Sequence, residues 1–166
     1  MILTRRISST LVTFGIAVCV LLLVWPMSVT GAGPQLKGSG TGTITNIEIT
    51  PLRDAGGNQR QARSITGVVD GALSGTFVEE VTGTIHRNGR VTFGGTLIFT
   101  GFVEGCGQDQ HTLTLGLSGQ GQAGLPVTEA MVRVIKHPSN TLQATGHGII
   151  EQEGMNVTYE LEYMCR

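Results

Sequence analysis

A thiol, an imidazole and a carboxylate occur close together near the middle of the chain. Cys106 and His111 lie five residues apart, and Glu104 is nearby. A histidine that takes the proton of a thiol produces a reactive thiolate, so this group could form the site of a cysteine nucleophile. A disulfide at Cys106 would consume that thiol, and we regard the disulfide as the better interpretation.

Neighbouring carboxylates are a second candidate for chemistry, because general acid–base catalysis needs groups that give and take protons. Glu79 and Glu80 are adjacent, and Glu151 and Glu153 lie two residues apart. Both pairs fall in segments whose pattern predicts strands and a turn. We interpret all four carboxylates as solvent-facing charges.

The sequence predicts neither a nucleotide site nor a metal site. Residues 119–124 spell Gly-x-Gly-x-x-Gly, but Pro126 and β-branched residues follow where a dinucleotide-binding loop needs a helix. We interpret that segment as a flexible connection between strands and expect no cofactor. The histidines lack the His-x-His or His-x-x-x-His spacing that puts two metal ligands on one element, so we predict no metal site at His86, His111, His137 and His147.

The N-terminus predicts export. Arg5 and Arg6 precede an uncharged, mostly apolar run of 15 residues from Leu11 to Trp25, which is the order of a secretory signal peptide. A membrane-spanning helix needs about 20 such residues, so we favour cleavage over anchoring. We expect residues 1–32 to be a signal peptide, or a membrane anchor if uncleaved, and the protein to be periplasmic or extracellular.

The cysteines fit the same compartment. Once Cys19 has left with the signal segment, Cys106 and Cys165 remain, and an even pair in an exported protein favours a disulfide. In the chain-entropy description, such a bridge stabilises the fold by roughly 3–4 kcal/mol. The alternative is a pair of free thiols.

The charge of the remaining chain excludes one class of partner. Without Arg5 and Arg6, 9 basic residues face 12 acidic ones, which gives a net charge near −3. A mildly acidic domain has no electrostatic footprint for nucleic acid, so we expect no nucleic-acid partner.

Alternating side chains predict an all-β domain. Val157, Tyr159, Leu161 and Tyr163 alternate with polar residues, as the hydrophobic residues between 113 and 117 also do. We predict residues 33–40 to be a flexible leader and residues 41–166 to form one domain. The eight expected strands lie near 41–50, 62–69, 72–86, 90–103, 110–118, 130–136, 143–151 and 156–164.

Turns and glycines favour a closed barrel. The Asn88-Gly89 dipeptide predicts a two-residue hairpin loop with positive φ at both positions. A bent antiparallel sheet of eight strands can close on itself, and closure removes the exposed edges. We therefore predict a single antiparallel barrel rather than a two-sheet sandwich. The glycines that we expect to mark bulges or bends inside strands are Gly75, Gly83, Gly94, Gly95, Gly101, Gly116, Gly146 and Gly148.

Five short segments carry a resemblance to a known family. They are residues 74–77, 94–101, 138–142, 146–149 and 159–163. Through them the chain resembles a family of uncharacterised bacterial domains that look like small allene-oxide-cyclase-like β-barrels. The resemblance implies a barrel. The plant cyclases isomerise a fatty-acid epoxide in an apolar cavity, but none of their catalytic residues aligns with this sequence. Assigning that activity to this chain would rest on similarity of fold alone.

Three functional hypotheses follow. The first is a non-enzymatic exported barrel that binds a small apolar or amphipathic ligand, because eight strands leave room for one small ligand or for packed side chains alone. The second is an isomerase, which needs a polar residue inside the barrel, with His147 or Glu104 as candidates. The third is a cell-envelope structural or interaction module with an exposed apolar patch. The residues expected to line a ligand site, or else to fill the core, are Leu113, Leu115, Leu117, Tyr159, Leu161, Tyr163 and, as a polar member, His147.

Overall fold

The computed structural model describes residues 33–123 and 127–166, so the predicted signal segment at 1–32 lies outside the described residues. All regular elements of the described part are β-strands, and none of the described residues forms an apolar helix of membrane-spanning length. The strands are β1 (Leu36–Ala55), β2 (Asn58–Gly71), β3 (Leu73–Ile85), β4 (Arg90–Val103), β5 (His111–Gln122), β6 (Val127–Val134), β7 (Ala144–Glu153) and β8 (Asn156–Cys165).

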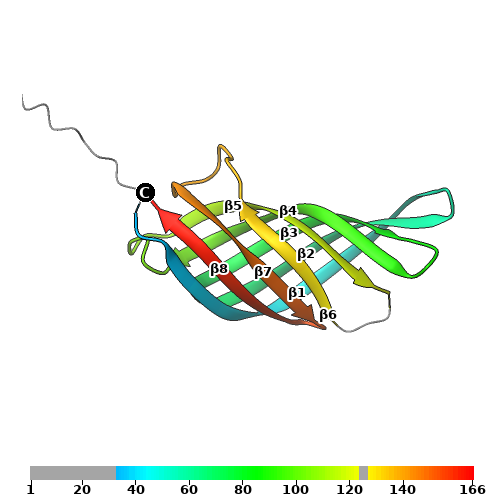
Figure 1. The fold of residues 1–166 in the computed structure, drawn as a ribbon, viewed down its shortest axis with the longest axis horizontal. Helices are drawn as coiled ribbons and strands as arrows, with labels where there is room; N and C mark the ends of the chain where they lie inside the picture. Colours follow the sequence, from blue (N-terminus) through cyan, green and yellow to red (C-terminus); the bar gives the residue numbers. More distant parts are fainter. Residues whose placement is uncertain (1–32, 124–126) are drawn as a thin grey trace, which may run out of the picture. The chain divides into compact units, whose positions relative to one another are not determined.

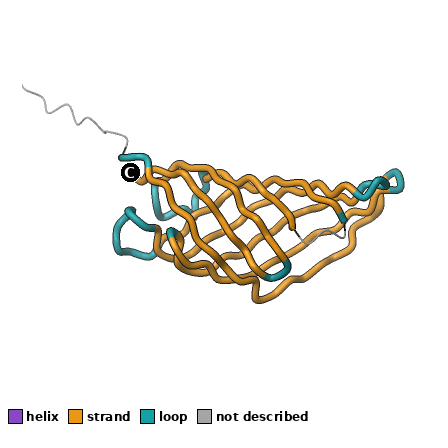
Figure 2. The backbone as a smooth tube through the Cα atoms, turned by 60° about the horizontal axis from the view of Figure 1, so that its bottom comes forward, coloured by secondary structure: helices purple, strands orange, loops and turns teal. Residues whose placement is uncertain are grey.

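The eight strands form one closed antiparallel barrel (Figure 1). Each strand pairs with the next along the chain, and β8 returns to pair with β1 from Leu36↔Tyr163 to Thr43↔Asn156. Figure 2 shows the same closure from a second direction, with the strands coiling around a common interior. The predicted barrel is confirmed.

The start of β1 differs from the sequence expectation. Residues 36–40, which we predicted to be flexible leader, pair with residues 159–163 of β8 and complete the barrel wall. The sequence of this segment explains the strand, because apolar or small residues alternate with polar ones. The alternating residues are Leu36, Lys37, Gly38, Ser39 and Gly40. Without this segment the sheet would lack the pairing that closes it.

One further boundary differs from the prediction, and one further predicted strand is present. Residues 119–122, which we interpreted as a flexible connection, continue β5 and pair with β4, with Gly119 opposite Phe93. Strand β6 covers Val127–Val134, in agreement with the strand that β-branched residues predicted there.

The inward faces of all strands form the hydrophobic core. On β3 and β4 the odd-numbered residues point inward, so Phe77 pairs with Phe99 and Leu73 with Val103 inside the barrel. Phe99 is completely buried and Ile65 is 1% exposed. The core therefore runs through the centre of the barrel and positions whatever polar group shares that face.

Several glycines inside the strands lie opposite aromatic residues, and none of the eight that we expected to mark bulges or bends lies at a bulge. In the register, Gly67 lies opposite Phe77, Gly119 opposite Phe93 and Gly146 opposite Tyr163. A Cβ atom at Gly67 would lie 2.5 Å from the Phe77 ring. The two register shifts in the barrel fall between Ile44 and Asn46 and between Leu52 and Ala55, away from the eight glycines we named.

The β3–β4 turn also differs from the predicted type. Only Gly89 has a positive φ, 82°, whereas the predicted loop needs positive φ at Asn88 as well. The Gly89 N–H donates to the His86 carbonyl at 2.9 Å, and the His86 N–H donates to the Arg90 carbonyl at 2.8 Å. This is the longer hairpin loop in which one glycine in the left-handed region follows a tight turn.

Candidate functional site

A cavity of about 50 Å³ lies in the barrel interior, and all eight strands contribute to its wall. The wall is aliphatic and aromatic except for the carboxyl of Glu79 on β3 and the amide of Gln152 on β7. A space of this size holds a few water-sized groups, because one water needs roughly 10–15 Å³ on the same measure. The interior therefore offers a small apolar site with two polar side chains.

Glu79 faces inward because it shares the parity of Phe77 and Val81, which are 5% and 4% exposed. Its cross-strand partners are Ile65 on β2 and Leu97 on β4, both buried. This burial raises the pKa of Glu79, and the positive charge of Arg63 partly opposes the rise. Among residues 33–123 and 127–166, no side chain forms an ion pair with the Glu79 carboxyl.

Arg63 is the cationic side chain that lowers the pKa of this carboxyl. It lies on the inward face of β2 opposite Val81, one inward position from Ile65, which pairs with Glu79. The Arg63 Nε atom is buried and has no hydrogen-bond partner in the described part of the chain. Arg63 and Glu79 are thus diagonal neighbours across the two strands. Both side chains keep hydrogen-bonding groups that are not paired with each other.

Two tyrosines of β8 close one end of the interior. The Tyr159 hydroxyl accepts from the Leu73 N–H at 2.8 Å and lies 3.0 Å from the Leu73 carbonyl and 3.1 Å from the Asp70 carbonyl. The Tyr163 hydroxyl donates to the Glu104 carbonyl at 2.9 Å. Burial raises the pKa of both phenols, so they stay protonated and fix β8 to the β2–β3 turn and the β4–β5 loop.

The sequence-predicted lining residues are all buried except one. Leu115, Tyr159 and Leu161 line the main cavity, whereas Leu113 and Tyr163 line a separate void of about 20 Å³. Leu117 is 5% exposed and pairs with Gly95 inside the barrel.

His147 is the exception, and its expected interior position is wrong. Its side chain is 69% exposed, and its Nε2 atom lies 3.9 Å from a carboxylate oxygen of Glu162. On β7 the inward positions are even-numbered, with Gly146, Gly148 and Ile150 pairing with the inward residues of β8, so His147 must point outward.

The other groups that suggested chemistry are also accounted for. Cys106 is bound to Cys165 in a disulfide, so it offers no nucleophilic thiol. Glu104 is exposed in the loop after β4, and it is therefore not the buried polar residue that an isomerase needs. His111 has a buried Nε2 atom with no partner among the described residues. In the same residues, no three His, Cys, Asp or Glu side chains gather as metal ligands.

Glu79 is the site residue that our sequence reasoning missed. We expected both Glu79 and Glu80 to face solvent, and only Glu80 does, where it accepts a hydrogen bond from the Ser64 hydroxyl at 2.6 Å. Adjacent residues of a strand point to opposite faces, so one of the two had to point inward. The parity of Phe77 and Val81 indicates which one.

Replacing Glu79 by glutamine is expected to stabilise the barrel at neutral pH. A raised pKa means that the folded state holds the Glu79 proton where the unfolded chain has lost it, so the native protein loses stability as pH rises above the ordinary value of 4.5. Glu79→Gln cannot ionise and escapes this loss. Urea denaturation should give a higher midpoint for Glu79→Gln than for the native protein at neutral pH, and the difference should shrink on acidification below 4.5.

The matched control is Glu80→Gln on the outward face of the same strand, which should show no such pH-dependent gain. If Glu79→Gln proved less stable than the native protein at neutral pH, the carboxylate would be stabilised in its charged form, with Arg63 as its only described cationic influence.

Exposed apolar side chains occur on the outer face of β2, β3 and β4. Val78 pairs with Ile98 across the two strands, and both are about two-fifths exposed. Threonines separate them from Val68 and Phe102. Scattered apolar residues of this kind are common on protein surfaces and identify no partner by themselves.

Comparison with solved structures supports the fold. The barrel is similar to a crystal structure of a protein of unknown function from the DUF3224 family of Shewanella oneidensis MR-1, with a TM-score of 0.61 and 17% sequence identity. The match covers 80% of this chain and 98% of that one. No family model matches the sequence, and no curated protein does. The chain thus has the barrel fold of an uncharacterised protein, as the resemblance in its sequence implied.

Proposed function

We propose that the protein is exported and that its barrel binds a small, mostly apolar molecule carrying one hydrogen-bond donor. The observation that carries the proposal is the Glu79 carboxyl, which faces an apolar cavity and forms no ion pair with the described residues. The carboxyl is partly buried, and its desolvation costs free energy, so a ligand that donates a hydrogen bond to it recovers part of that cost.

The cavity limits the ligand to a compact shape. About 50 Å³ leaves space for a few non-hydrogen atoms, and apolar side chains form almost the whole wall. Gln152 supplies an amide that can both donate and accept, on the β7 side of the same space. A short alkyl chain ending in an amine or a hydroxyl matches this combination.

Export is supported by the disulfide. Cys106 and Cys165 form the bond that their even number predicted, and such bonds persist in oxidising compartments. The binding partner is therefore expected among small molecules outside the cytoplasm.

The dimensions of the interior cavity disfavour an allene-oxide-cyclase-like reaction inside the barrel. Pockets for drug-sized ligands span about 300–1,000 Å³, and this cavity is about 50 Å³. A fatty-acid epoxide would need a far larger space. We therefore favour binding over isomerisation.

The test is a titration followed by NMR of the side-chain methyl groups, with n-butylamine, n-butanol and butyrate as probes. We expect saturable shifts at Leu115, Ile150 and Val157, strongest with the amine and absent with butyrate, because two carboxylates repel each other. Glu79→Gln should weaken butylamine binding by about tenfold, since it removes a charge-assisted hydrogen bond.

Glu80→Gln is the matched control and should bind butylamine like the native protein. Shifts that grow linearly with every probe, or equal butylamine affinity in native and Glu79→Gln proteins, would rule out the interior site.

A further inference from the structure

Most of the arginines gather on the two hairpins β1–β2 and β3–β4. Figure 1 shows these hairpins extending together at the end of the barrel opposite the C-terminus. They carry five of the nine basic residues that follow residue 32, although the chain there is acidic overall. The five are Arg53, Arg60, Arg63, Arg87 and Arg90.

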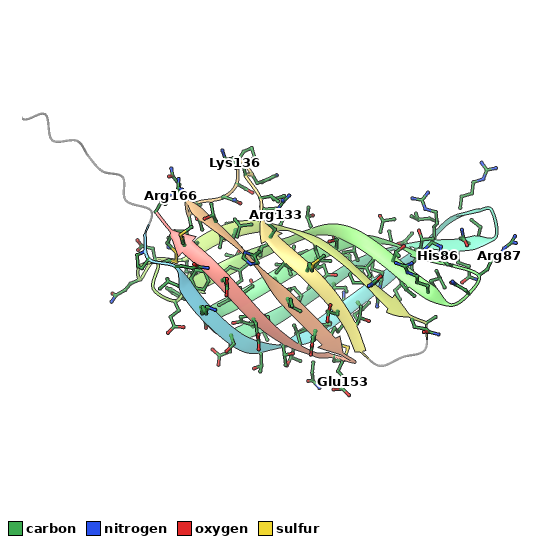
Figure 3. The ribbon with its side chains drawn as sticks, in the orientation of Figure 1. His86, Arg87, Arg133, Lys136, Glu153 and Arg166 are labelled. Atoms are coloured by element: carbon green, nitrogen blue, oxygen red, sulfur yellow. A yellow bond between two sulfur atoms is a disulfide. The ribbon has the colours of Figure 1, made fainter. Side chains whose placement is uncertain are left out.

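An open depression lies where the two hairpins meet. It is lined by Asn58 of β2, by residues 86–88 of the β3–β4 turn, and by Arg90 and Thr92 of β4. Figure 3 shows His86 and Arg87 at this end of the barrel. No acidic residue lines the depression, and no carboxylate in the described part of the chain pairs with Arg87 or Arg90.

The two guanidinium groups are held in place by neutral contacts. The Arg87 guanidinium packs against Gly57, filling the space that a Cβ atom would take there. The Arg90 Nη2 atom donates to Gln120 Oε1 at 2.8 Å. Because neither contact neutralises the charge, both arginines retain donors for an anion.

The two asparagines present donors to the same space. Asn58 Oδ1 accepts from the Arg87 N–H at 3.3 Å, and Asn88 Oδ1 accepts from the Arg90 N–H at 3.0 Å. With each amide oxygen engaged by the backbone, the NH₂ group of each side chain remains as a donor. Thr92 adds a hydroxyl, which lies 3.0 Å from His86 Nε2.

We propose that this hairpin depression is an anion-binding site that takes a phosphate group. A tetrahedral oxyanion accepts several hydrogen bonds at once, which suits planar guanidinium forks flanked by amide and hydroxyl donors. The site is separate from the interior cavity and opposite to it in charge, so the two bind chemically different ligands. The phosphate can be free or part of an ester.

The experiment titrates the full chain with inorganic phosphate and with glycerol 3-phosphate at constant ionic strength, followed by amide shifts of the hairpin residues. We expect saturable binding of both, which the double variant Arg87→Gln/Arg90→Gln weakens by at least about tenfold. Arg133→Gln, an exposed arginine on β6, is the matched control and should leave binding unchanged.

Vesicles of phosphatidylglycerol, compared with vesicles of phosphatidylcholine, distinguish the sources of the phosphate. Binding of phosphate and vesicles, with both lost in the double variant, places the group on a lipid, whereas binding of the soluble phosphates alone makes it a soluble ligand. No saturable phosphate binding, or an equal loss in Arg133→Gln, would overturn the proposal.

Discussion

Phe99→Ala is expected to lower the free energy of unfolding by about 3–5 kcal/mol, the usual cost of removing a fully buried phenyl ring. Phe99 has no exposed surface, and its cross-strand partners Phe77 and Leu113 are buried as well. The ring also covers Gly101 on its own strand, which has no side chain to fill the space left behind. Urea denaturation at neutral pH measures the loss.

Phe102→Ala is the control, because it removes the same ring from the same strand on the outward face, where Phe102 is 45% exposed. Its loss should stay below about 1 kcal/mol, the range of ordinary surface substitutions. Similar losses in the two variants would mean that the parity of β4, and with it the inward position of Glu79 on β3, is wrong.

The barrel could be predicted because its strands alternate so regularly. Tyr159, Leu161 and Tyr163 share one parity on β8, and the structure places all three inside. Alternation gives the face of each residue once the strand is recognised, and the burial of one whole face then requires a closed or covered sheet. The interior lining was therefore accessible from the sequence.

Two errors have a common cause, which is that residue type was allowed to outweigh position. Glu79 was assigned to solvent because it is charged, although it lies midway between Phe77 and Val81 on the inward face. Residues 36–40 were assigned to a leader because they contain Gly and Ser, although they alternate like a strand. In both cases the period of two was the better guide.

His147 shows the limit of reasoning without register. It sits in a strand flanked by Gly146 and Gly148, and glycines give no hydrophobic parity from which to read a face. Only the pairing of Gly148 with Leu161 on β8 reveals that His147 points outward.

The cavity itself could not be predicted from the sequence. Its walls come from all eight strands, and its volume is the small difference between the space inside the barrel and the side chains that fill it. Glycines opposite aromatic rings, such as Gly67 opposite Phe77, change the cavity volume, and the size of this change cannot be predicted from the sequence of one strand.

The two proposed sites make different demands on the fold. The interior site needs a rigid barrel, because a cavity of about 50 Å³ disappears if the surrounding side chains rearrange. The hairpin depression needs only that the β1–β2 and β3–β4 turns stay together, which the Asn58 and Arg87 contact favours. A variant that loosens the packing of the barrel interior should therefore affect the interior ligand first.

Removing the disulfide is expected to lower the free energy of unfolding by roughly 4 kcal/mol. Cys106 in the loop after β4 and Cys165 at the end of β8 are 59 residues apart in sequence, and their Cα atoms lie 5.6 Å apart. In the chain-entropy description the bond restricts the unfolded chain more strongly as the enclosed loop grows. Chemical denaturation of Cys165→Ser, compared with the native protein, measures the effect.

The disulfide is lost whether one cysteine is replaced or both are, and this gives the control. Cys106→Ser, Cys165→Ser and the double variant should have nearly the same stability, which the native protein should also approach under dithiothreitol. If instead the two single losses added in the double variant, each cysteine would contribute through its packing and not through the bond. Folding in a reducing cytoplasm would then cost the barrel little, and the disulfide would no longer support export.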